Sequence, residues 1–183
     1  MPDAYSLVPD AVPVLAGHGL SLRALTEADL DAWFGRLSDP EAAKLARDPV
    51  ATSRQAVVDG LAYHRRALAE KSGIRWSIVP DALGASVGTI GLGSFVAGAR
   101  SAEIGAAIGR ANWSRGIATG AGRLVIDYAR TALALHRIDA LVLAHNARVI
   151  RVLDKLGFVR CGAAPRDREI GGEPSLLYAC TLR

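Results

Sequence analysis

Cysteine is scarce in this chain of 183 residues, and the two that occur, Cys161 and Cys180, stand in no metal-ligand or nucleophile spacing. We expect both to be reduced, partly buried thiols. The 4 histidines share no ligand spacing either, and the sequence predicts no metal site.

Long apolar runs are also missing. Half of the residues are hydrophobic, but Gly, Arg or Asp interrupts each run well before the roughly 20 residues that a bilayer span needs. Residues 1–19 lack the basic start and apolar stretch of a secretory signal and contain three prolines. We therefore expect no transmembrane segment and a cytoplasmic location.

Lysine is rare, with 3 of the 22 basic residues, and no run of consecutive basic residues is interleaved with aromatics. This composition argues against nucleic acid as a partner. The charge is nevertheless uneven, because residues 1–99 hold 9 basic and 11 acidic side chains while residues 100–183 hold 13 and 7. The basic second half favours a compact phosphate ligand.

Hydrophobic periodicity predicts one domain over residues 1–183, which begins with an irregular arm over 1–19. Thr26 and Asp29 form a capping box at the start of a first helix. Ser53 is expected to cap a second helix that ends near Gly73. The other expected elements are strands at 20–25, 75–79, 86–95, 101–109, 136–144, 158–162 and 175–182, and helices at 121–133 and 147–156.

The three central strands follow one another and imply an antiparallel meander, after which helices and strands alternate. We expect an α/β (mixed α+β) fold with a mixed, mostly antiparallel central sheet of about six to seven strands and helices on both faces.

The segment WSRGIATGAG, residues 113–122, carries the clearest chemical signal, because it joins an expected strand to an expected helix. Gly116 and Gly120 allow a tight turn, and the unsatisfied N–H groups of the helix's first turn form a site for phosphate oxygens. A plain tight turn would need the same glycines. Arg110 and Arg115 nearby favour the anion site.

Residues 103–158 resemble the GNAT N-acetyltransferase superfamily, and within it the branch of the RimJ/RimL ribosomal-protein acetyltransferases. WSRGIATGA is similar to the family's pyrophosphate-binding turn, with Gly116 and Ala118 at its two small positions. HRIDALVLAHNARVIRVLDKLGF is similar to the branch's strand, Asn-containing turn, helix and terminal LGF, and LSLRALTEADLDAW to its opening.

The resemblance implies that acetyl-CoA, used as a cosubstrate without a metal, lies where two parallel strands of the sheet splay apart. Residues 101–109 would form the strand that holds the thioester, although they would also serve as an ordinary core strand. Asn146 would reach the cofactor or the attacking amine, or would be a turn residue. The cofactor-binding residues expected with Asn146 are Ala106, Ile108, Gly109, Arg110, Arg115, Gly116, Ile117, Ala118 and Thr119.

Glu103 is the candidate general base, because an amine must be neutral to attack a thioester. It lies on the expected thioester strand, where alternation turns it away from the packed face of Ile104 and Ile108. A solvated or ion-paired carboxylate is the alternative for Glu103. Glu169 and Glu173, before the last strand, are lower-ranked candidates for the substrate pocket.

The sequence departs from the branch at several positions. Trp113 begins the turn motif, Gly120 replaces a frequent Glu, and Val149 and Leu153 stand where a Ser and a thiolate-protonating Tyr occur in relatives. The resemblance still implies direct transfer in a ternary complex to a primary amine, either a protein or peptide N-terminus or a small molecule, by a monomer or homodimer. A regulatory module that binds acyl-CoA without turnover is the alternative.

Overall fold

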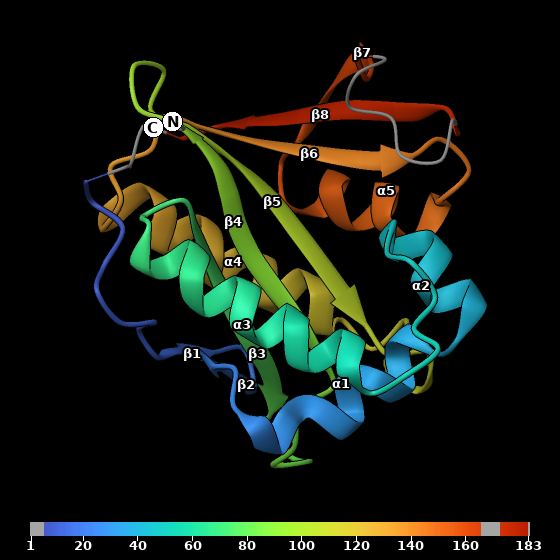
Figure 1. The fold of residues 1–183 in the computed structure, drawn as a ribbon. Coiled ribbons are helices and arrows are strands. Elements are labelled where there is room, and N and C mark those ends of the chain that lie inside the picture. The colour runs from blue at the N-terminus through green and yellow to red at the C-terminus, as the bar shows by residue number, and fades with distance from the viewer. Residues whose placement is uncertain (1–5, 166–172, 183) are drawn as a thin grey trace.

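A computed structural model describes residues 6–165 and 173–182, and within them eight strands form one mixed sheet in the order β1-β2-β3-β4-β5-β6-β8-β7 (Figure 1). All neighbouring pairs are antiparallel except β5 and β6. The strands are β1 (Leu15–Gly17), β2 (Leu20–Ala24), β3 (Gly73–Pro80), β4 (Gly88–Val96), β5 (Ser101–Ile108), β6 (Arg137–Leu143), β7 (Val159–Ala163) and β8 (Ser175–Thr181).

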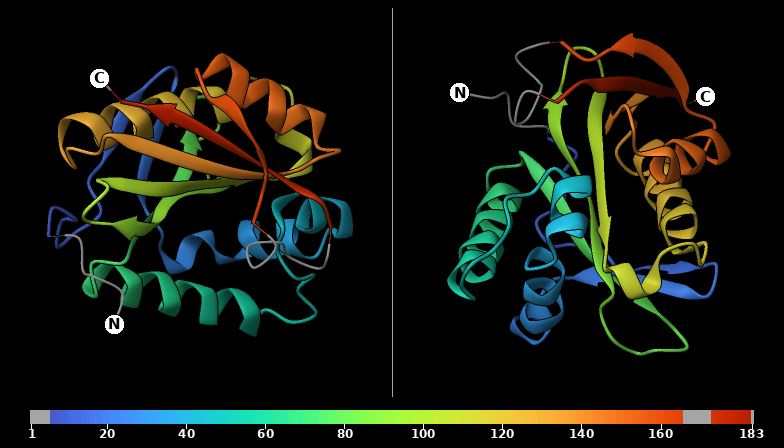
Figure 2. Two further views of the ribbon diagram at one scale, coloured as in Figure 1. Left: turned by 90° about the horizontal axis from the view of Figure 1, so that it is seen from above. Right: turned by 90° about the vertical axis from the view of Figure 1, so that its right-hand side faces the viewer.

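Helices cover both faces of the sheet, with α1 to α3 on one side and α4 and α5 on the other (Figure 2). The mixed, mostly antiparallel sheet and its two helical layers confirm the expected fold class. The helices are α1 (Leu30–Leu37), α2 (Pro40–Ala46), α3 (Gln55–Ala69), α4 (Ile117–Thr131) and α5 (Ala147–Lys155), with short 3-10 turns η1 (Glu27–Asp29) and η2 (Arg110–Asn112).

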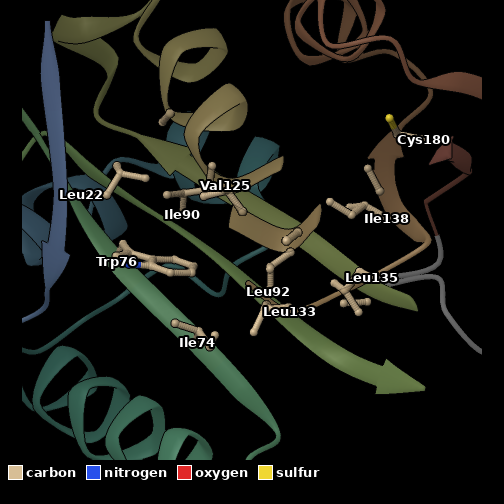
Figure 3. Close-up of a cluster of buried hydrophobic side chains, with 14 of the residues drawn as sticks. Leu22, Ile74, Trp76, Ile90, Leu92, Val125, Leu133, Leu135, Ile138 and Cys180 are labelled. Carbon is tan, nitrogen blue, oxygen red and sulfur yellow. The ribbon is translucent and has the colours of Figure 1, made fainter. Parts of the chain in front are cut away.

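The main core lies between the sheet and α4, where alternate residues of the central strands meet one face of the helix (Figure 3). Trp76 of β3 is fully buried and meets the ring of Tyr128 edge to face at 5.7 Å. Its indole donates a 2.8 Å hydrogen bond to the carbonyl oxygen of Pro13, which ties the N-terminal arm to the sheet. A smaller apolar cluster, with Trp33 and Leu61, joins α1 to α3 on the other face.

Several boundaries differ from the sequence prediction. The expected irregular arm contains β1, which pairs with β2 and raises the sheet from the expected six or seven strands to eight. The helix α2 was not predicted at all. The cap of α3 is Arg54 rather than Ser53, and it makes no side-chain capping bond. The capping box of Thr26 and Asp29 is confirmed, but it opens the turn η1 before α1 begins.

The parallel pair β5 and β6 separates after only three register positions, which end at Glu103 opposite Asp139. Beyond that point β5 continues to Ile108 along β4, while β6 follows β8, so the two strands diverge (Figure 1). We call this divergence the fork. The expected splay of two neighbouring parallel strands is therefore present, and Glu103 stands at its base.

None of the helices among the described residues is long and apolar enough to cross a membrane.

Candidate active site

A cavity of about 590 Å³ opens at the fork, and β5, β6, α2, α5 and the first turn of α4 form its walls. Nine of the predicted catalytic and cofactor-binding residues line it, although they come from three separate segments of the chain. These residues are Glu103, Ala106, Ile108, Arg115, Gly116, Ile117, Ala118, Thr119 and Asn146.

The first turn of α4 presents backbone donors to this cavity. Gly116 is the N-cap in a left-handed conformation with φ of 79°, and the first bond within the helix runs from the Gly120 amide to the Gly116 carbonyl at 2.9 Å. The amides of residues 117–119 precede that bond, so the helix gives them no acceptor. No acidic residue occupies this turn. The amides and the helix dipole together suit an anionic ligand.

Trp113 lines the cavity and follows η2. Its indole donates a 2.7 Å hydrogen bond to the Ile108 carbonyl oxygen, and the guanidinium of Arg148 lies 4.7 Å from the ring centroid. The aromatic residue at the first position of the turn motif therefore fixes the loop to the strand before it.

Gly109 and Arg110 do not line the cavity. The Gly109 amide donates to the Val87 carbonyl oxygen at 2.9 Å and so continues the sheet. The Arg110 guanidinium pairs at 2.9 Å with the carboxylate of Asp39, the N-cap of α2, and also with the carboxylate of Glu41 in the first turn of that helix. Arg110 thus holds the unpredicted helix α2 against η2.

Asn146 is buried at the N-terminus of α5, with 4% of its surface exposed. Its amide oxygen accepts from the Val149 amide at 3.3 Å, and its nitrogen donates to the Leu45 carbonyl oxygen at 3.4 Å. Asn146 therefore caps α5 and connects it to the end of α2 across the cavity.

The candidate carboxylates differ in their surroundings. Glu103 lines the cavity and is partly buried, on the strand face opposite Ile104 and Ile108, which pack into the core. Glu173 is not a lining residue and pairs with Lys44 at 2.9 Å, a hydrogen bond that lowers the pKa of Glu173. Glu169 lies outside the described residues.

Arg47 and Asp48 also line the cavity, and sequence reasoning missed them. They follow α2. The sequence shows where this helix starts, because Asp39 is a capping residue and Pro40 suits the first turn. In the structure Asp39 accepts from the amides of Glu41 and Ala42. The carboxylate of Asp48 accepts from Nη1 of Arg36 at 2.9 Å.

The departures from the family pattern have a structural account. Val149 and Leu153 both line the cavity, and among its described lining residues none is a tyrosine, histidine or cysteine. A β-carbon at position 120 would lie 3.1 Å from the Leu20 side chain and 3.3 Å from His18. Gly120 thus gives the strands β1 and β2 room to pack against α4.

A second hollow, of about 730 Å³, lies on the other side of the α4 N-terminus. It shares Arg115, Gly116 and Thr119 with the first cavity and adds the basic side chain of Arg123. Lys155 also lines both spaces. An extended anionic ligand can therefore pass from one to the other around the helix terminus.

A serine-nucleophile site and a metal site find no support among the described residues. Residues 84–88 carry the pattern Gly-x-Ser-x-Gly, but they join two antiparallel strands rather than a strand and a helix, and the Ser86 hydroxyl bonds to Ser77 at 2.7 Å. No group of three or more potential metal ligands occurs in the part of the chain that the structure describes.

Comparison with known proteins gives a consistent result. The family model described as "Acetyltransferase (GNAT) domain" matches residues 20–159. The uncharacterized N-acetyltransferase YoaA of Bacillus subtilis is 31% identical over 162 residues, which cover 88% of this chain and 92% of YoaA.

Two solved structures share the architecture. Mycobacterium smegmatis RimJ in complex with CoA-disulfide superposes with a TM-score of 0.79 at 29% identity, over 94% of this chain and 88% of RimJ. The ribosomal L7/L12 alpha-N-protein acetyltransferase RimL, in complex with coenzyme A, has a TM-score of 0.77 over 93% of this chain and 98% of its own. At 17% identity, RimL supports the fold alone.

Proposed function

Because this chain belongs to the GNAT acetyltransferase family and is an acetyl-CoA-dependent N-acetyltransferase, we propose that it acetylates a primary amine by direct attack within a ternary complex. The acceptor is a protein or peptide N-terminus or a small amine. The observation that carries the proposal is the meeting of the β5–β6 fork and the first turn of α4 at one cavity.

Acetyl-CoA fits the groups around this cavity. The amides of residues 117–119 and the guanidinium of Arg115 are suited to its diphosphate. The second hollow, with Arg123 and Lys155, is suited to the nucleotide end. The stretch of β5 that no longer pairs with β6, with Ala106 and Ile108, would hold the thioester between the two strands.

The expected roles of three further residues change in this proposal. Gly109 and Arg110 support the site from outside, because one extends the sheet and the other holds α2. Asn146 positions α2 and α5 on the two sides of the cavity, because its amide oxygen and one of its N–H groups have partners on these two helices.

In the reaction, the lone pair of the neutral amine forms a bond to the thioester carbonyl carbon and the carbon–sulfur bond breaks. The carboxylate of Glu103, directly or through water, accepts the proton that the amine nitrogen loses. The departing thiolate takes up a proton from water, to which Glu103 returns the proton it accepted, since the described lining residues offer no tyrosine. The products are an N-acetylated amine and free CoA.

Two measurements test the proposal. Titration of CoA into the protein should show binding in the micromolar range, and a thiol-release assay with acetyl-CoA and a panel of amines and peptides should show turnover. Absence of CoA binding would contradict the cofactor assignment. CoA binding without release across the whole panel would contradict transfer to an amine.

A further inference from the structure

Three arginines come from elements on the sheet face opposite α4 (Figure 2), and one of them, Arg47, lines the cavity. Arg36 comes from α1, Arg47 ends α2, and Arg75 comes from β3. We call them the arginine cluster. Asp48 is the carboxylate between them, since it accepts from Arg36 at 2.9 Å and its charge also acts on the Arg75 guanidinium. Arg47 and Asp48 bring the cluster to the cavity wall.

Arg75 connects this cluster to the strand of the fork. In the sheet register Arg75 lies opposite Gly91, and Gly91 lies opposite Gly105 of β5. Nη1 of Arg75 donates a 2.9 Å hydrogen bond to the Gly105 carbonyl oxygen, and Gly105 lines the cavity. The positive charge of the cluster therefore reaches the part of β5 that β6 has left.

Two arginines of the cluster, and Trp33 beside them on α1, carry buried donors without an acceptor. Within the described residues, the indole Nε1 of Trp33, Nε of Arg36 and Nε of Arg75 are buried and have no hydrogen-bond acceptor. Trp33 and Arg36 are 9% and 6% exposed. Folded proteins rarely leave such donors unsatisfied, because each one loses its bonds to water. Unsatisfied donors on both α1 and β3 indicate a hydrogen-bond acceptor that comes from outside the chain.

The neighbouring histidine adds no charge to the cluster. His64 stacks on Trp33 with ring centroids 5.7 Å apart. Burial, with a contribution from the Arg75 charge, lowers the pKa of His64 to about 3, so the ring is neutral at physiological pH. The carboxylates near the cluster are Asp48, which Arg36 and Arg75 meet, and Glu103, on the face of β5 that Arg75 reaches. A net positive charge remains beside the cavity.

We propose that the acceptor is a small amino acid whose carboxylate binds at the arginine cluster while its amine lies near Glu103. The proposal rests on the proposed function and names its substrate class. Guanidinium groups recognise carboxylates through charge-assisted hydrogen bonds. The acceptor is small because the same cavity of about 590 Å³ also receives the thioester arm. CoA has separate partners for its phosphates at the α4 N-terminus, so it leaves this cluster to the acceptor.

The test compares amino acids with their own carboxamides as acceptors in the thiol-release assay, with rates corrected for the neutral fraction of each amine. The wild-type kcat/KM should favour the free acid by about tenfold to a hundredfold, the factor expected for a charge-assisted hydrogen bond. Spermidine and neutral peptides with a free N-terminus complete the panel and should be poorer acceptors than the acids.

Arg47→Gln should reduce that preference for the acid to about threefold or less, and Arg47→Lys should retain part of it. Arg66→Gln, an exposed change on α3, is the matched control and should keep the wild-type preference. A melting curve of each variant establishes that it is folded, and Arg75→Lys provides a second variant of the cluster.

Three outcomes would overturn the proposal. Equal use of acids and carboxamides, preference for spermidine or peptides, or an unchanged acid preference in both Arg47→Gln and Arg75→Lys would exclude a carboxylate site at the cluster while acetyl transfer itself stands. No thiol release with any amine would instead contradict the proposed function, and this inference with it.

Discussion

The side chain of Arg75 crosses strand β4 over Gly91 and donates a 2.9 Å hydrogen bond to the carbonyl oxygen of Gly105 on β5. A β-carbon at position 91 would lie 2.9 Å from Cδ of Arg75 and would collide with the carbonyl oxygen of Ile74. Gly91 is therefore the residue that permits an arginine of β3 to reach the strand at the fork.

Gly91→Ala should lower the free energy of unfolding by about 1–3 kcal/mol, the usual cost of overpacking a tight position. Gly98→Ala is the matched control, because no atom lies within 4 Å of the β-carbon it would add. The control should change stability by less than about 0.5 kcal/mol. Denaturant titration measures both, and equal midpoints for the two variants would contradict the close approach at Gly91.

Gly116→Val should abolish CoA binding. Gly116 and Gly157 have nearly the same left-handed φ, 79° and 81°, and no atom lies within 4 Å of an added β-carbon at either. Valine therefore strains the backbone alike at both positions, but only Gly116 lines the cavity. In calorimetric titration Gly157→Val should still bind CoA. Retained affinity in a folded Gly116→Val variant would place the diphosphate elsewhere.

Local sequence patterns were enough to predict most of the sheet and the turn of the site. The capping box of Thr26 and Asp29, the alternation in β3 to β5 and the helical stripe of α4 are all formed by residues close in sequence. The turn at Gly116 was predictable for the same reason, since the motif and its geometry occupy one segment.

Features that depend on distant residues were not predictable. Asp39 and Pro40 mark the start of α2, but its seven residues are too few to show a periodic apolar face. Its contacts with Arg110 and Asn146 join parts of the chain about 70 to 100 residues apart. Likewise, nothing in the sequence around Arg36 or Arg75 indicates that one sheet face brings them to Asp48. The strand β1 has only three residues, which are too few to show an alternating pattern, and it is recognised by its pairing with β2.

Asp29 should stabilise the fold in a pH-dependent way. Burial opposes ionisation, but hydrogen bonds from Arg23, at 2.7 and 2.8 Å, and from the Thr26 amide outweigh it and lower the pKa of Asp29 below 3.8. A lowered pKa means that the folded state binds fewer protons than the unfolded state as the pH falls. The stabilisation is complete above pH 3.8 and is lost as the pH drops through the folded-state pKa.

Asp29→Asn should therefore reduce the free energy of unfolding by about 1.5–3 kcal/mol at neutral pH, as for hydrogen bonds to a charged group. The difference from the wild type should shrink as the pH falls below 3.8. Asp31→Asn removes a carboxylate that is 83% exposed and pairs with Arg54, and should cost at most about 1 kcal/mol. A difference between wild type and Asp29→Asn that stays constant with pH would contradict the ionised pair with Arg23.

The final prediction concerns Glu103, which lies opposite Asp139 at the last position where β5 pairs with β6. If the Glu103 carboxylate takes the amine proton, Glu103→Gln should lower kcat by about a hundredfold or more, within the usual range for a general base. Asp139→Asn is the matched control, because Asp139 is the register partner of Glu103 on β6. The carboxylate of Asp139 is already paired with Arg137 at 2.7 Å. The control should retain most of the wild-type rate.

The affinity for acetyl-CoA separates a chemical role of Glu103 from a structural one. The backbone amides of residues 117–119 belong to another element than Glu103, so the KM for acetyl-CoA should stay nearly constant while kcat falls. Raising the pH should partly rescue Glu103→Gln, because more of the acceptor amine is then neutral without a base. Near wild-type turnover of Glu103→Gln at neutral pH would identify Glu103 as an ion-paired or solvated carboxylate. Asp48, the other carboxylate among the described residues that line the cavity, would then be the next group to test as the base.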